Sequence, residues 1–187
     1  MFSLEGKFLR KIGSRGNLDG LLKGPCDVVM DLKNRLVVAD RDNHRVQVLS
    51  SEGKFLFNIG SYGSTEGKFD SPRHVTVTND NHVIVSDSNN GRVQRFDENG
   101  QYVGFLGTGK KGTNAGQFQC PSGLCTDTED NLVVGDFKNL TVQVFGKEGI
   151  FVKSIGEGVL SKPTGLCVTN SGNVLVADRG AHKIFLF

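Results

Sequence analysis

The chain has 187 residues, of which 37% are hydrophobic and 22% are charged, and its net charge at pH 7 is +2. These proportions are typical of a folded globular domain and exclude a disordered chain. No stretch approaches the roughly 20 apolar residues of a membrane span, so we expect no membrane association.

A motif of constant spacing repeats four times along the chain. A proline is followed fifteen residues later by an aspartate that ends an apolar run, at Pro25/Asp40, Pro72/Asp87, Pro121/Asp136 and Pro163/Asp178. A β-branched residue follows each aspartate at +6 and a large apolar residue follows at +9. Glycines come at +13 and +20 in the first three repeats. A period of about 20 to 50 residues indicates stacked supersecondary units.

Each repeat predicts four short strands in chain order. In the first repeat they cover residues 27–31, 36–39, 45–49 and 55–59. The second strand of every repeat is apolar throughout, which is typical of a strand covered on both faces, whereas the third strand alternates. Turns rich in glycine and asparagine separate the strands, and no amphipathic helix pattern competes. The sequence therefore predicts an all-β fold, a β-propeller of four-stranded antiparallel blades.

We predict one domain over residues 1–187, with repeat units at about 14–60, 61–107, 108–156 and 157–187 plus 1–13. The last unit combines both chain ends because residues 7–12 have the spacing of a fourth strand. In a closed ring of four blades they would pair with residues 183–187 and remove an exposed sheet edge. The alternative is a part of a larger ring, of six blades, with open edges. Because the repeat pattern begins at the N-terminus, we expect no signal peptide.

Two residue types in the repeats look functional, and both are interpreted as structural. The four repeated aspartates are expected to accept backbone N–H groups in the turns that they open. Cys125 and Cys167 occupy the same position of the first strand and are expected to be buried thiols. No cysteine pair has zinc spacing, so we expect no metal and no cofactor, and free thiols favour a cytoplasmic location.

The segments around the aspartates carry a family resemblance. Residues 39–48 (ADRDNHRVQV), 86–94 (SDSNNGRVQ) and 177–184 (ADRGAHKI) resemble the NHL repeat. Residues 112–118 (GTNAGQF) resemble that family's connecting segment ahead of the next proline. The third repeat departs from the pattern, because residues 137–141 replace the Asn-His-Arg element. The chain contains no tryptophan, which argues against a propeller of the WD type.

The resemblance implies a recognition domain. NHL propellers are similar to the C-terminal domains of tripartite-motif ubiquitin ligases, where they bind protein substrates or RNA, and a minority of relatives are enzymes. The expected function is non-catalytic recognition of a protein partner or acidic peptide, as the substrate-recognition part of a tripartite-motif-type ubiquitin ligase or a related scaffold. The alternative is an RNA-binding domain that acts in post-transcriptional regulation. A lyase-type enzyme is a remote alternative, and no DNA partner is expected.

The charges of the predicted loops indicate where a partner binds. Loops after the second and fourth strands lie at one end of a propeller and carry an excess of lysine and arginine, whereas the opposite end carries an excess of acids. Such a distribution steers an anionic partner to the basic end. The candidate binding residues are Arg41, Arg45, Arg73, Arg92, Lys110, Lys111, Arg179 and Lys183. For Arg45 and Arg92 an alternative is open, in which they pair with Asp42 and Asp87.

An RNA ligand would require more than these charges. The sequence pI is about 8.3, whereas nucleic-acid-binding domains typically exceed about 9. Base stacking also needs aromatic side chains at the basic end. The candidates are Tyr62, Phe69, Phe118 and Phe137, of which Phe69 and Phe118 are expected to pack into the core.

No catalytic residue is predicted. A lyase-type metal centre needs several histidines or carboxylates around one ion, and of the four histidines only His74 lies on a predicted first strand. The run from Gly107 to Gly112 resembles a phosphate-binding loop but leads into a strand, where that motif requires a helix. We therefore expect that the chain is not an enzyme.

Overall fold

The computed structural model describes residues 1–187 and contains β-strands, turns and one three-residue 3-10 segment, Arg41–Asn43. Its four sheets are named blades 1 to 4, and consecutive strands in each blade pair antiparallel. The strands are β1 (Pro25–Met30), β2 (Leu36–Asp40), β3 (Arg45–Leu49) and β4 (Phe55–Ile59) in blade 1; β5 (Pro72–Val77), β6 (Val83–Asp87), β7 (Arg92–Phe96) and β8 (Tyr102–Leu106) in blade 2; β9 (Pro121–Thr126), β10 (Leu132–Asp136), β11 (Thr141–Phe145) and β12 (Phe151–Ile155) in blade 3; and β13 (Pro163–Val168), β14 (Val174–Asp178) and β15 (Lys183–Leu186) in blade 4. No helix has the length and hydrophobicity that a membrane crossing requires.

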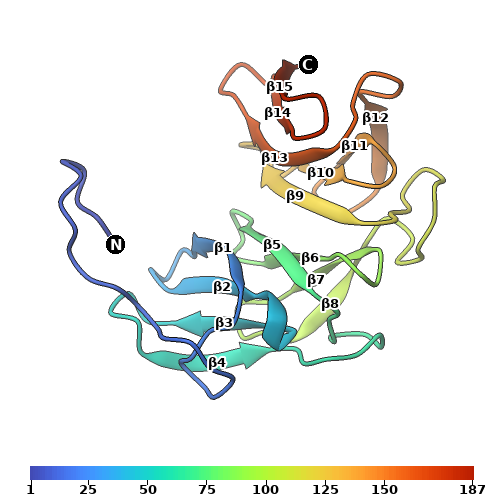
Figure 1. Cartoon of the computed structure of the whole chain (residues 1–187). Coiled ribbons are helices and arrows are strands. Elements are labelled where there is room, and N and C mark those ends of the chain that lie inside the picture. Colours follow the sequence, from blue (N-terminus) through green and yellow to red (C-terminus); the bar gives the residue numbers. More distant parts are fainter.

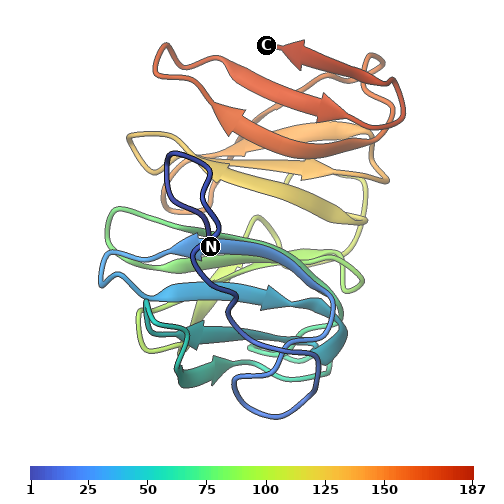
Figure 2. The same cartoon turned by 60° about the vertical axis from the view of Figure 1, so that its left-hand side comes forward.

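The blades stack face to face along an arc whose inner edge is formed by the first strands (Figures 1 and 2). β1 contacts β5, β5 contacts β9, and β9 contacts β13. Gly123 of β9 permits the close approach of β13, because a Cβ atom at this position would lie 2.2 Å from the carbonyl oxygen of Thr164. The predicted all-β propeller of antiparallel blades is thereby confirmed.

The predicted closing pair is not formed, so blade 4 has three strands. β15 pairs with β14, whereas the N-terminal segment folds back on itself through a bridge between Phe2 and Phe8. The N-terminal ammonium donates to the carbonyl oxygen of Arg10 at 2.7 Å. The two chain ends lie at opposite ends of the arc (Figure 1), so residues 7–12 and 183–187 of one chain do not meet. Of the two predicted alternatives, the pairing of 157–187 with 1–13 in a closed four-blade ring is not formed here, and the open edges correspond to the alternative of a part of a larger ring.

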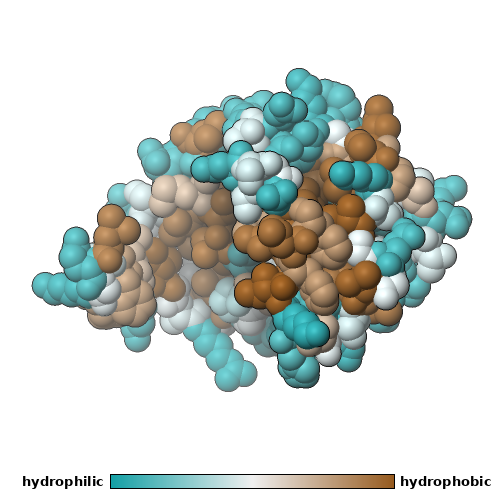
Figure 3. Space-filling model, turned by 90° about the horizontal axis from the view of Figure 1, so that it is seen from above, coloured by the Kyte–Doolittle hydropathy of each residue, from teal (hydrophilic) through white to brown (hydrophobic).

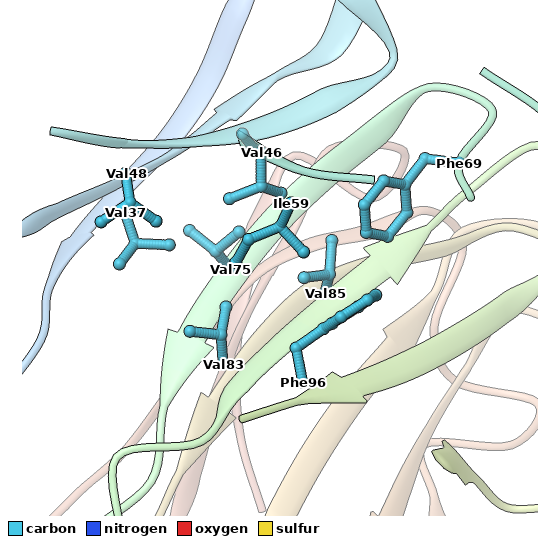
Figure 4. Close-up of a cluster of buried hydrophobic side chains, with 10 residues drawn as sticks. Val37, Val46, Val48, Ile59, Phe69, Val75, Val83, Val85 and Phe96 are labelled. Atoms are coloured by element: carbon cyan, nitrogen blue, oxygen red, sulfur yellow. The ribbon is translucent and has the colours of Figure 1, made fainter. Parts of the chain in front are cut away.

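Apolar side chains of neighbouring blades form the core between them. The cluster between blades 1 and 2 contains Val37, Val46 and Ile59 from blade 1 and Val85 and Phe96 from blade 2, each at most 1% exposed (Figure 4). Corresponding clusters lie between blades 2 and 3 and between blades 3 and 4. Alternate residues of a strand point to opposite faces. This explains why the second strand of each repeat is apolar throughout.

The repeated aspartates are buried at the ends of the second strands and bind the connector that precedes their blade. Asp40 accepts a hydrogen bond from the backbone N–H of Lys23 at 2.6 Å, and Asp87 accepts one from that of Asp70 at 2.7 Å. The aspartates of blades 3 and 4 also accept backbone N–H groups of the turns that they open. Burial raises the pKa of Asp87 despite these hydrogen bonds. The predicted structural role of the aspartates is confirmed, and the predicted bonds from the N–H groups of the following turn form in blades 3 and 4 but not in blades 1 and 2.

The two cysteines at the same repeat position differ in exposure. Blade 4 packs against Cys125, which is half-buried, and burial raises the pKa of its thiol to about 12. Cys167 occupies the corresponding position of blade 4, where no further blade covers it, and it is exposed. The expectation of a buried thiol is therefore wrong for Cys167.

Candidate functional site

The basic end of the propeller contains an open groove of about 480 Å³ that spans blades 2 to 4. Its walls come from the start of β5, the loop after β6, the connector before β9 and the loops after β10 and β14. We name it the basic groove, and its lining residues are Arg73, His74, Ser88, Asn89, Lys111, Gln119, Cys120, Ser122, Phe137, Lys138, Thr164 and Arg179. The antiparallel meander places these loops at one end because they follow second and fourth strands.

Four permanent cations line the basic groove without a carboxylate among the lining residues: Arg73, Lys111, Lys138 and Arg179. None of the four forms an ion pair within the fold. The Nε atom of Arg73 is buried and has no hydrogen-bond partner. Lys111 donates only to the backbone oxygen of Asn89, at 2.8 Å. The groove is thus an electropositive site whose four cations have no carboxylate partner within the fold.

Two carboxylates near the groove are satisfied by other groups. Asp136 is buried and accepts backbone N–H groups from Gln119 at 2.7 Å and from Lys138 at 3.0 Å. Asp27 of β1 lies 3.3 Å from Nδ1 of His74. Burial raises the pKa of Asp27, but the hydrogen bond with His74 and the N–H of Val75 outweigh it and lower this pKa below its usual value. Both acids are therefore engaged, which leaves the groove cations free to bind an external anion.

The structure brings three of the predicted site residues together in the basic groove, namely Arg73, Lys111 and Arg179. Arg41 lies on blade 1, outside the groove, where it pairs with Asp42 at 2.7 Å. Lys110 is exposed in the connector beside the groove, and Lys183 is exposed at the start of β15. The candidate residues are thus distributed over the basic end, and only part of them share one concave surface.

Arg45 and Arg92 do not belong to the binding surface. Arg92 is 6% exposed, and its Nε donates to Asp87 at 2.7 Å. Its other nitrogens donate to carbonyl oxygens of the connector at Ser64, Thr65 and Lys68. Arg45 makes the equivalent hydrogen bonds in blade 1. It donates to the motif aspartate at the end of β2 and to carbonyl oxygens of the connector that precedes the blade. Both guanidinium groups therefore hold a connector against its blade, which corrects their assignment as ligand-binding residues.

Sequence reasoning missed Lys138 and the polar residues around it. Lys138 follows the aspartate of the third repeat by two positions, where the first repeat has Asp42. This replacement of an acid by a base was the feature of the sequence that could have identified Lys138 as a binding residue. Phe137 lies beside it, and the ammonium group of Lys162 sits 5.8 Å from the centre of its ring. The departure of the third repeat from the family pattern thus coincides with a wall of the groove.

The side chains that line the groove are suited to binding an anion. Guanidinium groups bind carboxylates and phosphates through paired N–H donors, and ammonium groups add point charges. Cys120 also lines the groove, but burial raises the pKa of its thiol, so it stays protonated at neutral pH. No three of the histidine, cysteine, aspartate and glutamate side chains gather closely enough to hold a metal ion.

Several solved propeller structures are similar to this chain. A catalytically inactive virginiamycin B lyase from Staphylococcus aureus, crystallised with quinupristin, has 16% sequence identity and a TM-score of 0.69, over 87% of this chain and 51% of its own. A structure of a nidogen/laminin complex has 18% identity and a TM-score of 0.69, over 88% and 60%. The WD40 propeller domain of Doa1 has 16% identity and a TM-score of 0.69, over 87% and 50%. No curated protein sequence matches the chain.

These similarities show the propeller fold, and this chain spans about half to three fifths of the length of those structures. They also correct one sequence-based expectation. Virginiamycin B lyase and streptogramin B lyase are enzymes built on propellers that resemble this one. The expectation that the chain is not an enzyme is therefore wrong, because propellers of this kind can be catalytic.

Four repeats of the chain match one family model. The model is that of the NHL repeat, and it matches residues 22–49, 69–96, 118–145 and 160–187. Each match begins in a connector and ends at the last residue of the third strand or directly after it. The matches include the aspartates, the buried arginines and the apolar second strands described above. An NHL-repeat propeller is in broad terms a binding module, and this chain belongs to the NHL repeat family.

Proposed function

We propose that the chain is a recognition module whose basic groove binds an acidic segment of a partner protein. The observation that carries this proposal is the convergence of Arg73, Lys111, Lys138 and Arg179 on one groove that no carboxylate lines. The unpaired Nε of Arg73 supports the proposal further. A buried donor without a hydrogen-bond partner lowers the stability of the fold, and a ligand that accepts the hydrogen bond removes this cost. Clusters of arginine are a recurrent means of binding acidic motifs.

The shape and lining of the groove favour a peptide over a single ion. A volume of about 480 Å³ exceeds the needs of one carboxylate. Ser88, Asn89, Gln119 and Thr164 supply hydroxyl and amide groups along it. Such groups can bond a peptide backbone, while the four cations bind its acidic side chains. The groove therefore fits a short extended segment that contains aspartate, glutamate or a phosphorylated residue.

The aromatic residues favour a protein ligand over RNA. Phe69 and Phe118 are at most 1% exposed, so they belong to the core. Tyr62 is exposed but lies against the ring of His44 on blade 1, with 4.7 Å between ring centres. Phe137 is the single aromatic residue that lines the groove. Recognition of single-stranded RNA typically uses several stacked bases, for which one ring is a poor platform.

Within a larger protein, such a groove would select the partner. In a tripartite-motif-type ubiquitin ligase or a related scaffold, the acidic segment would mark the substrate protein. The nidogen structure, which is a complex with laminin, supports the use of this fold for binding proteins.

Charge reversal in the groove is expected to abolish partner binding. The variant Arg73→Glu/Lys138→Glu turns two of four attractive charges into repulsive ones. Affinity purification from cells should recover from the wild type proteins that this variant does not recover. The control is Arg15→Glu/Lys54→Glu, which makes the same change of net charge at exposed residues outside the groove.

A short peptide of glutamate and serine should compete for the partners that the wild type recovers, and a lysine and serine peptide should not. If the groove variant and the control recover the same proteins, the basic groove is not the binding site. If RNA with a defined sequence replaces the protein partners, the ligand class is RNA.

A further inference from the structure

Blade 3 lacks an internal arginine that blades 1 and 2 possess. The residue that pairs with the motif aspartate across the second and third strands is Arg45 in blade 1, Arg92 in blade 2 and Thr141 in blade 3. In blades 1 and 2 the guanidinium group binds the aspartate and carbonyl oxygens of the connector. Threonine is too short to make these contacts and has one hydroxyl donor where arginine has five N–H donors.

The connector of blade 3 nevertheless lies in the same place as its counterpart in blade 2. Gln143 accepts the N–H of Gly116 at 2.9 Å and donates to the carbonyl oxygen of Gln117 at 2.7 Å. The equivalent glutamine of blade 2 makes the same two bonds at 3.0 and 2.8 Å. Asn139 donates to the carbonyl oxygen of Gly112 at 3.0 Å, as its counterpart in blade 2 does at 2.9 Å. The backbone around the arginine position is therefore kept in blade 3, and only the arginine side chain is missing.

An open pocket of about 510 Å³ lies at this position. We name it the blade 3 pocket, and its lining includes Thr141, Ala115 and Ser154. In blade 2 the same repeat positions hold an arginine, a glutamate and a phenylalanine. There the guanidinium carbon of Arg92 lies 5.5 Å from the ring centre of Phe105. Three smaller side chains thus leave a space in blade 3 where blade 2 holds a guanidinium group.

The blade 3 pocket contains hydrogen-bond acceptors that lack a donor. The guanidinium of Arg92 donates to the carbonyl oxygen of Ser64 at 2.7 Å, whereas the equivalent carbonyl oxygen of Thr113 accepts no hydrogen bond within the fold. Asn139 lines the pocket, and its Oδ1 is buried without a hydrogen-bond partner. In blade 2 the counterpart asparagine and Arg92 donate to the same carboxylate oxygen, so this asparagine lies beside the guanidinium position. A buried acceptor without a donor costs free energy that a ligand donor removes.

The blade 3 pocket is lined mostly by polar and charged residues, in contrast to the apolar side chains that gather on the side of the molecule that carries blade 4 (Figure 3). Its charged residues are Lys138, Lys153 and Glu157, and Glu157 forms no ion pair within the fold. A lone arginine would meet two ammonium groups there. In an acidic segment, neighbouring carboxylates pair with these ammonium groups while the guanidinium pairs with Glu157. Lys138 and Gln119 line both this pocket and the basic groove, so one segment can reach both.

We propose that the blade 3 pocket binds an arginine side chain of the same partner segment whose acidic residues bind the basic groove. This inference rests on the proposed function of that groove. The guanidinium takes the place that an internal arginine fills in blades 1 and 2. It donates to the carbonyl oxygen of Thr113, to Oδ1 of Asn139 and to the carboxylate of Glu157, for which its five donors suffice. The recognised segment therefore combines acidic residues with an arginine.

Calorimetry with paired peptides tests this assignment. Each pair consists of a glutamate and serine peptide with one arginine and the same peptide with citrulline, which keeps the shape of arginine but has no charge. The arginine is placed at successive positions on either side of the acidic run. At one position the arginine peptide is expected to bind the wild type at least about tenfold more tightly than the citrulline peptide, because charge-assisted hydrogen bonds are lost with citrulline.

Two variants locate the preference in the blade 3 pocket. Thr141→Arg fills the pocket from within and should abolish the preference for arginine over citrulline. The control Val152→Arg adds the same charge at a residue of β12 that is 59% exposed and outside the pocket, and it should keep the preference. Glu157→Gln changes an exposed side chain and should reduce the preference with an unchanged circular dichroism spectrum.

The outcomes separate this inference from the function on which it rests. Equal affinity of the arginine and citrulline peptides at every position, with binding to the basic groove intact, would overturn the arginine site alone. A preference for arginine that persists in both Thr141→Arg and Glu157→Gln would also overturn it. If no acidic peptide binds the wild type, the basic groove and the arginine site fail together.

Discussion

Replacing Val37 with aspartate is expected to unfold the chain. Val37 is fully buried in the cluster between blades 1 and 2, among Val46, Val75 and Val85 (Figure 4). A carboxylate at this position has no cation or donor to pair with, and burying an unpaired charge costs several kcal/mol. Domains of this kind are stable by about 5–15 kcal/mol, so much of the free energy of folding is lost. Thermal unfolding followed by circular dichroism measures the effect.

The matched control for this substitution is Val103→Asp on β8. Val103 is 52% exposed, so the new carboxylate remains hydrated and the melting temperature should change little. If Val37→Asp melts at the wild-type temperature, the two blades do not pack as described.

Replacing Arg92 with alanine is expected to lower the free energy of unfolding by about 3–5 kcal/mol. In the wild type, the guanidinium group of Arg92 lies 2.7 Å from the buried carboxylate of Asp87. The substitution removes this partner and leaves the carboxylate buried. It also removes the guanidinium donor from three carbonyl oxygens of the connector. Urea denaturation gives the value.

Arg73→Ala separates the structural arginines from the groove arginines. Arg73 forms no ion pair within the fold, so its loss should change stability by less than about 1 kcal/mol. The same substitution should weaken binding of an acidic peptide. Equal destabilisation by Arg92→Ala and Arg73→Ala would contradict the different roles assigned to them.

The sequence predicts the fold well because its signals are local and repeated. The apolar second strands, the proline–aspartate spacing and the glycine turns each recur in phase, and each has the same physical reason in every blade. The structural role of Arg92 could be predicted for the same reason. It follows Asp87 by five positions, as Arg45 follows Asp40, and such a repeated pair indicates an internal partner.

The shape of the groove and the choice between a closed ring and an open arc could not be predicted from these local signals. The groove joins Arg73, Lys111, Lys138 and Arg179 from three blades, so it depends on how the blades are tilted toward one another. Ring closure depends on the rotation between blades, which accumulates over the whole arc. The periodic pattern specifies the contacts within and between blades, and it does not specify this angle.

Calorimetric titration of the chain with an acidic peptide tests the central proposal most directly. A glutamate and serine peptide is titrated into the wild type and into Arg73→Glu/Lys138→Glu, over a series of salt concentrations. We predict binding at one site that weakens with salt, and an affinity at least about tenfold lower in the variant, since two charge-assisted contacts are lost. Equal affinity in both proteins, or no binding to the wild type at low salt, would contradict the assignment of the basic groove as the recognition site.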